Sequence, residues 1–143
     1  MVSTHNNKDI FEGLRNGEVI PSSDPDCYKL RHASFVTKRL LVHLNNSCDA
    51  AQVRDLLSQI TGTEIDKSDA VFTPLYINYR KNTKIGRNVF INFDCVFLDL
   101  GGMTIEDGVL IAPKVTLLSE GHQVSPMDTH SFVPGHIYYI SIH

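Results

Sequence analysis

Three of the seven histidines, His122, His130 and His136, lie in one polar stretch near the end of the chain, residues 119–136. A histidine titrates near neutral pH, so it can take a proton from a hydroxyl nucleophile as a general base. A single histidine in a loop is more often simply solvated. Residue type alone therefore does not decide between these roles, and the rest of the chain must show what lies beside this stretch.

The cysteines Cys27, Cys48 and Cys95 are widely spaced and form no Cys-x-x-Cys pair. Three scattered cysteines predict neither a disulfide framework nor a zinc site, and we expect no bound metal. The first nine residues lack the apolar core of a secretory signal. Reduced thiols without an export signal favour a cytoplasmic location.

The composition is that of a soluble globular domain, with 143 residues, 42% hydrophobic and 20% charged. A formal charge of -3 gives no broad attraction for nucleic acid or for an anionic lipid surface. No run approaches the roughly 20 apolar residues that a membrane-spanning helix requires. We expect neither nucleic acid nor a membrane among the partners.

The second half of the chain repeats an apolar or aromatic residue about every six positions. Side chains realign after about 3.6 residues in a helix and 2 in a strand, so neither element explains this period. A six-residue period is typical of a solenoid of short straight edges, each placing one side chain inside. The residues are Tyr79, Ile85, Ile91, Phe97, Ile105, Ile111 and Leu117.

Two further features accompany the six-residue repeat. A second apolar residue follows four positions after several leads, at Val89, Cys95, Val109 and Val115. The spacing breaks between Phe97 and Ile105, where residues 99–102 (Asp-Leu-Gly-Gly) predict a small bulging turn. The alternative is a set of ordinary antiparallel strands, whose alternation would produce some spacings of six by chance.

Residues 1–69 have helical patterns instead. A short helix is expected from about residue 8 to 17, and Asp24 with Pro25 predicts the start of a longer one that ends near residue 45. Asp49 predicts the cap of a third helix, which ends at Gly62. The expected division is a helical segment over residues 1–69 and a partial solenoid over 70–143, with a projecting loop at 119–136. The apolar residues 137–142 are strand-like.

The chain resembles the maltose/galactoside acetyltransferases of the hexapeptide-repeat superfamily, over about residues 9–134. The likeness includes Leu-Arg-Asn-Gly-Glu at 14–18, and it is closest in residues 85–95 (Ile-Gly-Arg-Asn-Val-Phe-Ile-Asn-Phe-Asp-Cys) and 105–115 (Ile-Glu-Asp-Gly-Val-Leu-Ile-Ala-Pro-Lys-Val). The resemblance implies a mainly β fold with N-terminal helices: a shortened left-handed parallel β-helix. It also implies a homotrimer with active sites between subunits.

The same resemblance implies a reaction, transfer of the acetyl group of acetyl-CoA to a hydroxyl of a sugar or similar small acceptor. His122, in Glu-Gly-His, matches the catalytic histidine of the family and would act as general base. Asn92, in Ile-Asn-Phe, matches the active-site asparagine of the family, which implies a role both in catalysis and in substrate binding. Asn92 could instead be a corner residue in left-handed geometry. Acetyl-CoA is expected as a co-substrate, and no residue is assigned to its binding.

The acceptor positions follow the family only in part. Asn78 matches a position that contacts the sugar, and Phe90 stands at a substrate-binding position where the family often has tyrosine. Leu100 and Ser22 stand where carboxylates are common. The loss of a hydroxyl and two carboxylates predicts poor discrimination between sugars, or a less polar acceptor.

Members of the family continue past the loop with further coils, along which acetyl-CoA binds, whereas residues 135–143 do not develop into another repeat. Two hypotheses of different class follow. The first is an acetyl-CoA-dependent O-acetyltransferase in a shortened form. The second is a catalytically inactive truncated remnant that serves only as an oligomerisation or structural module.

Overall fold

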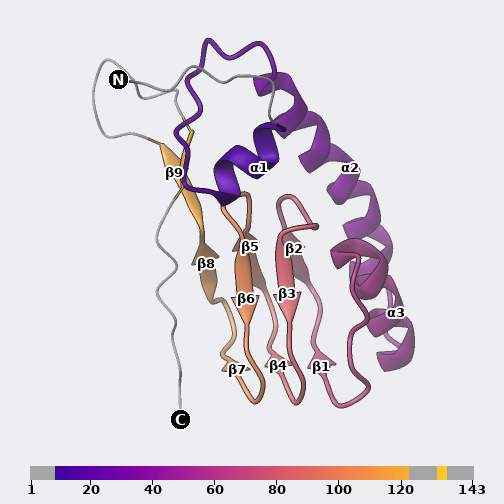
Figure 1. The fold of residues 1–143 in the computed structure, drawn as a ribbon. Helices are drawn as coiled ribbons and strands as arrows, with labels where there is room; N and C mark the ends of the chain where they lie inside the picture. Colours follow the sequence, from indigo (N-terminus) through magenta and orange to yellow (C-terminus); the bar gives the residue numbers. More distant parts are fainter. Residues whose placement is uncertain (1–8, 123–131, 135–143) are drawn as a thin grey trace.

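The computed structural model describes residues 9–122 and 132–134. In this part of the chain, helices precede a coil of short strands (Figure 1). The helices are α1 (Ile10–Arg15), α2 (Cys27–Asn45) and α3 (Ala50–Thr61). The strands are β1 (Ala70–Val71), β2 (Leu75–Ile77), β3 (Thr83–Ile85), β4 (Phe90–Ile91), β5 (Cys95–Leu98), β6 (Met103–Ile105), β7 (Leu110–Ile111), β8 (Thr116–Leu118), β9 (Glu120–His122) and β10 (Phe132–Pro134).

The strands β1 to β8 wind into a three-sided coil. One side is the sheet β1-β4-β7, the second is β2-β5-β8 and the third is β3-β6, and all these pairings are parallel. Ala70 pairs with Phe90, and Phe90 pairs with Leu110, so one coil takes 20 residues. The parallel register confirms the predicted solenoid and excludes the alternative of antiparallel strands for this region.

The repeated apolar residues fill the interior of the coil. Ile91 and Phe97 are fully buried, Ile105 is 5% exposed and Ile111 is 6% exposed. Val89 and Cys95, the second apolar residues of their repeats, are also buried, and Ile85 packs against the same core. Each such side chain contributes about 1.5–3 kcal/mol when it leaves water. This core holds the coil together.

Tyr79, the first residue of the predicted series, lies outside this interior. Its ring stacks on Phe11 of α1 with centroids 4.1 Å apart, and Ile77, 4% exposed, takes the interior place. The spacing therefore breaks in both coils, once after Ile77 and once after Phe97. Each break adds residues at one corner, and Leu100 at the second break is buried against α1. The residues added at these two breaks form the surface on which α1 packs.

The ends of the helices follow the predicted caps with one exception. Asp49 accepts a hydrogen bond from the Gln52 N–H at 2.8 Å at the start of α3, and Gly62 ends this helix with φ +75°. The second helix begins at Cys27, not at Pro25. The Asp24 carboxylate accepts from the Asp26 N–H at 2.8 Å and closes a turn ahead of the helix.

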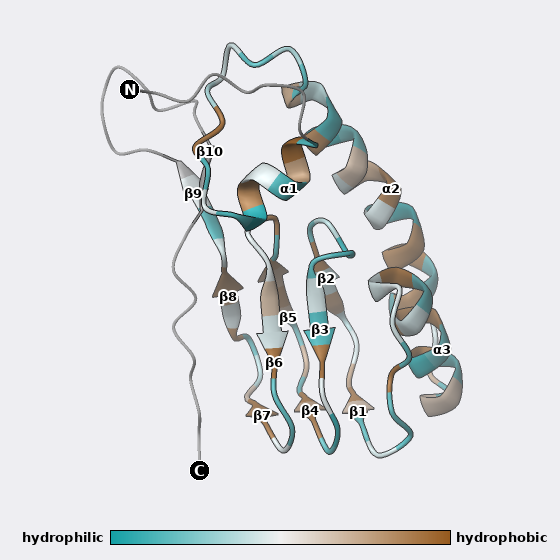
Figure 2. Cartoon of the chain, viewed as in Figure 1, coloured by the Kyte–Doolittle hydropathy of each residue, from teal (hydrophilic) through white to brown (hydrophobic). Residues whose placement is uncertain are grey.

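The helices cover one flank of the coil. α2 packs beside β2 and α3 beside β1 (Figure 1). Leu41, Leu44 and Leu57 from these helices belong to the same buried cluster as the coil interior. In Figure 2 the strands β1, β4 and β7 are hydrophobic, whereas the turns beside them are mostly hydrophilic. Helices and coil therefore share one core.

The chain leaves the coil after β8. β9 pairs antiparallel with β10, with His122 opposite Phe132, so the segment predicted as a projecting loop is a two-stranded ladder at its base. His130, His136 and residues 137–142 lie outside the described residues. The cysteines are free: Cys27 begins α2, Cys48 lies in the connection between α2 and α3, and Cys95 is buried inside the coil.

Candidate active site

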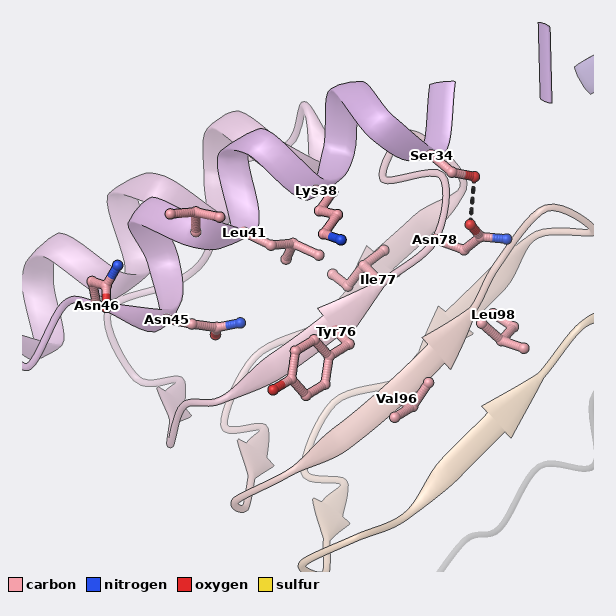
Figure 3. Close-up of a pocket in the computed structure, with 11 residues that line it drawn as sticks. Ser34, Lys38, Leu41, Asn45, Asn46, Tyr76, Ile77, Asn78, Val96 and Leu98 are labelled. Carbon is pink, nitrogen blue, oxygen red and sulfur yellow. Dashed lines mark hydrogen bonds between the residues drawn. The ribbon is translucent and has the colours of Figure 1, made fainter. Parts of the chain in front are cut away.

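Asn78 follows β2 directly and lies in a hydrogen-bonded cluster between helix and coil. Its side-chain oxygen accepts from the Ser34 hydroxyl of α2 at 2.6 Å (Figure 3). Its side-chain nitrogen donates to Oε1 of Glu120 at 2.5 Å. The carboxamide of Asn78 therefore joins α2, the end of β2 and the start of β9.

Glu120 is a half-buried carboxylate at the same corner. Its Oε2 accepts from the backbone N–H of Leu100 at 2.8 Å. Burial raises the pKa of Glu120 to about 7, although the bonds from Asn78 and Leu100 act in the opposite direction. The negative charge of Asp99 raises this pKa further. Glu120 is thus partly protonated near neutral pH.

Asp99 is fully buried beside this cluster. Its carboxylate accepts from the backbone N–H of Tyr79 at 2.6 Å and from the Thr83 hydroxyl at 2.8 Å. Burial raises the pKa of Asp99, and these hydrogen bonds act against that rise. Asp99 is satisfied by the two coils that it joins, so its role here is structural.

The predicted base, His122, ends β9 two residues after Glu120. Its backbone pairs with Phe132 of β10. Because β9 follows β8 after Ser119, the chain brings His122 to the edge of the coil where Asn78 and Glu120 lie. The backbone therefore places the predicted base near one of the predicted substrate residues.

Asn92 lies at a different corner, directly after β4. Its side-chain oxygen accepts from the Phe93 N–H at 2.8 Å, and its amide nitrogen has no partner among the described residues. The non-glycine residues with positive φ in the described chain are Arg80, Asn88, Asp94 and Lys114. The left-handed alternative for Asn92 is therefore wrong, and the residue presents a free N–H donor.

Three aromatic rings gather at the corner of the coil where Asn92 lies. Phe72 lies edge-on to Phe90 with centroids 5.0 Å apart, and it stacks on Phe93 at 4.8 Å. Phe72 is 43% exposed and Phe93 is 51% exposed. This corner therefore offers an apolar surface beside the amide donor of Asn92. Phe90, at a position where the resemblance implies tyrosine, adds no hydroxyl to it.

The two groups of site residues lie at opposite ends of the sheet β2-β5-β8. Asn92 comes before β5, whereas the Asn78 N–H donates to the carbonyl of Phe97 near the end of β5, at 3.0 Å. The length of β5, about 13 Å at 3.3 Å per residue, separates them. A single chain therefore brings together Asn78 and the strand of His122, but not these residues and Asn92.

A groove of about 600 Å³ runs between α2 and this sheet (Figure 3). Apolar side chains form most of its wall, and Asn78 lies at one end. Figure 3 shows the Lys38 amine directed into the groove, and Tyr76 along its floor is 45% exposed. The lining residues are Ser34, Lys38, Leu41, Val42, Asn45, Asn46, Tyr76, Ile77, Asn78, Val96 and Leu98.

Leu100 and Ser22, the two positions where the resemblance implies carboxylates, supply none. The side chain of Leu100 is 2% exposed and packs against α1, and Ser22 is exposed. Sequence reasoning missed Glu120 and Ser34, the partners of Asn78. An acidic residue two positions before the candidate histidine was the available signal for Glu120, whereas nothing in the sequence pairs Ser34 with Asn78, 44 positions away.

Within residues 9–122 and 132–134, no group of three or more His, Cys, Asp or Glu side chains gathers to bind a metal ion. A search of these residues finds no helix of the length and apolarity that crossing a membrane demands. The arrangement can therefore offer hydrogen-bond donors, a titrating carboxylate and an apolar groove.

The comparisons with known proteins agree on one class. The galactoside O-acetyltransferase of Escherichia coli is 32% identical over 120 residues, which cover 82% of this chain and 57% of that protein. The crystal structure of a maltose O-acetyltransferase from Clostridium difficile covers 91% of this chain and 70% of its own, with 25% identity and a TM-score of 0.79. A galactoside acetyltransferase in complex with coenzyme A covers 90% of this chain and 64% of its own, with 28% identity and a TM-score of 0.70.

These proteins confirm the resemblance inferred from the sequence. The chain is similar in sequence and in fold to galactoside and maltose O-acetyltransferases, and it has the left-handed parallel β-helix fold of its structural neighbours. It spans less than two thirds of the length of the curated relatives that it matches. No family model matches it.

Proposed function

We propose that the chain transfers the acetyl group of acetyl-CoA to a hydroxyl of a sugar or similar small acceptor. The observation that carries this proposal is the shared fold with a galactoside acetyltransferase in complex with coenzyme A, over 90% of this chain. His122 in β9 and Asn92 after β4 supply residue types that this reaction requires. The cytoplasm, where acetyl-CoA is available to an enzyme with free thiols, is the proposed location.

His122 would act as the general base. It takes the proton of the acceptor hydroxyl as the oxygen attacks the thioester carbonyl, a contribution of about 10²–10⁴-fold. The tetrahedral intermediate then carries a negative oxygen, and the free N–H of Asn92 is a suitable donor to it. Collapse of the intermediate expels the thiolate of CoA, which receives the proton from His122.

We further propose that the site forms between copies of the chain in a homotrimer. Asn92 and the strand of His122 lie at opposite ends of the sheet β2-β5-β8, so one chain does not bring them to a common acceptor. A neighbouring copy that presents its Asn92 corner to this edge would complete the site. Leu118, 49% exposed, and Tyr76, 45% exposed, are apolar side chains on the same sheet that contact between copies would cover.

The test is acetyl transfer by the 143-residue chain. Free thiol is followed with acetyl-CoA and either maltose or a thiogalactoside, for the parent and for His122→Ala. We expect thiol release that depends on the acceptor, and a loss of at least a hundredfold in the variant without a change in melting temperature. No release above background together with no binding of acetyl-CoA by calorimetry would instead indicate the non-catalytic module.

A further inference from the structure

Glu120 is a half-buried carboxylate that the proposed reaction leaves without a role. We propose that Glu120 is an acceptor-binding residue, whose carboxylate accepts a hydrogen bond from a hydroxyl of a neutral polyol at the Asn78 end of the groove. This inference rests on the proposed acetyl transfer and names a group that selects the acceptor. It concerns a residue that the sequence analysis did not assign.

The side chain of Asn78 already makes two hydrogen bonds within the fold. The Ser34 hydroxyl occupies its side-chain oxygen, and its amide nitrogen donates to Glu120. An amide held from both sides orients its neighbour, so Asn78 positions the carboxylate of Glu120. The Asn78 amide still has a second N–H and a second lone pair that can bond to the same ligand.

Glu120 keeps unused capacity to accept hydrogen bonds. An ionised carboxylate has about four lone-pair sites, and neutral donors, the amide of Asn78 and the N–H of Leu100, bond one to each oxygen. Among the side chains that the structure describes, no Lys or Arg forms an ion pair with Glu120. The side chain also keeps part of its surface exposed. A ligand hydroxyl would bond to an acceptor that residues 9–122 and 132–134 leave incomplete.

The charges around this corner favour a neutral ligand. Asp99 adds a second negative charge beside Glu120, so an anionic ligand would be repelled. Lys38 directs its amine into the groove from α2 (Figure 3). The groove wall and the Asn78 end therefore carry charges of opposite sign, and a ligand of either charge would be repelled at one of them. Other titratable groups nearby are Tyr76 in the groove, Tyr79 next to Asn78 and His122 two residues further along β9.

The groove that ends at Asn78 suits the rest of such a ligand. Tyr76, Ile77 and Val96 line it from the strands, and Leu41 lines it from α2. The C–H faces of a sugar ring can pack on these apolar side chains. Glu120 is not itself part of the groove wall, but it bonds to Asn78 at this end, where a hydroxyl of the ligand would reach it. Asn45 and Asn46 line the groove away from Asn78 (Figure 3), and the Asn45 carboxamide is bonded to the backbone of Leu75. No carboxylate is among the lining residues, so Glu120 beside Asn78 marks that end and gives the ligand a direction.

The experiment measures binding without acetyl-CoA. Methyl galactoside and maltose, neutral polyols that do not titrate, are bound to the whole chain and to Glu120→Gln by calorimetry at pH 5.5 and pH 8. The ionised carboxylate is the stronger acceptor, so the affinity of the parent should rise about tenfold between these pH values. Glu120→Gln should bind equally at both pH values and match the parent only at pH 5.5.

Two controls separate Glu120 from other groups. Glu106→Gln changes an exposed carboxylate on another corner of the coil and should keep the pH response of the parent. His122→Asn removes the proposed base, which itself contacts the acceptor hydroxyl. A pH response that is reduced but still present in this variant assigns the remainder to Glu120. The inference would be overturned if the pH response of binding survived in Glu120→Gln or disappeared in His122→Asn. It would also be overturned if the parent bound neither polyol. Acetyl transfer is measured in a separate assay, so a chain that binds the polyols without transferring acetyl groups is distinguished from one that does not bind them.

Discussion

The backbone of Gly101 lies against the backbone carbonyl of Ser119, so that a Cβ at position 101 would collide with that oxygen. Ser119 is held there by its N–H, which donates to the carbonyl of Leu98 at 2.8 Å, and by its hydroxyl, which donates to the same carbonyl at 2.9 Å. The bulge at residues 99–102 therefore makes room for the start of β9. The strand that carries His122 depends on a glycine in the preceding coil.

Gly101→Ala should destabilise the fold by about 2–3 kcal/mol, because the added methyl group meets backbone that cannot move aside easily. Gly121→Ala is the matched change, since a Cβ at Gly121 meets no atom within 4 Å. Urea unfolding of both variants checks the difference. Equal unfolding midpoints would contradict the close approach of Gly101 and Ser119.

Ile111→Asp should prevent folding or reduce stability by several kcal/mol, because it places a charge without a partner inside the coil. Leu110→Asp is the control on the same strand, since Leu110 is 55% exposed and Ile111 is 6% exposed. Circular dichroism and urea unfolding distinguish the two variants. A soluble, fully folded Ile111→Asp protein would show that this side chain does not face the interior.

The stability of the parent should fall as the pH rises from about 5 to 7.5. The pKa of Glu120 is raised from 4.5 to about 7 in the folded chain, so the folded state keeps a proton that the unfolded state releases over this range. The stabilisation is complete below the unfolded pKa and is lost as the pH passes the folded pKa. The size of this loss is of order 2–3 kcal/mol.

Glu120→Gln should not show the part of this pH-dependent loss of stability that comes from Glu120. Asp99, whose pKa is also raised by burial, titrates in both proteins, so the difference between them isolates Glu120. Urea unfolding at a series of pH values measures it. Parallel curves for parent and variant would mean that Glu120 ionises as an exposed carboxylate does.

Asn92→Ala should lower kcat by about 10²–10³-fold if the free N–H of Asn92 stabilises the oxyanion. Its stability should change little, because the one hydrogen bond lost is to the adjacent Phe93 N–H. Steady-state kinetics and thermal unfolding test the two parts. A variant with the kcat of the parent would remove Asn92 from the proposed mechanism.

Much of the fold could be predicted because the residues that fill the interior of the coil recur at a regular spacing in the sequence. Ile91, Phe97 and Ile111 recur at a fixed spacing and each is buried, as the period indicates. The limits of the prediction are at the corners. Tyr79 fits the period by number, yet the bulge after Ile77 turns it outward to stack on α1.

The site was less predictable, because its contacts join residues that no local pattern connects. Asn78 and Glu120 are 42 positions apart, and only the stacking of coils and the exit of β9 bring them together. The residue types at Asn92 and His122 were visible in the sequence, but the length of β5 between their corners was not. The antiparallel pairing of β9 with β10 was missed for the same reason, since polar residues and a proline predict a loop.

The most direct test of acetyl transfer to a hydroxyl is detection of the product. The 143-residue chain is incubated with acetyl-CoA labelled in the acetyl group and with a galactoside, and the acceptor is recovered for NMR and mass spectrometry. We predict a labelled acetyl ester on a sugar hydroxyl, formed in proportion to the thiol released. Recovery of unmodified galactoside, with thiol released only by hydrolysis or not at all, would contradict the proposed function.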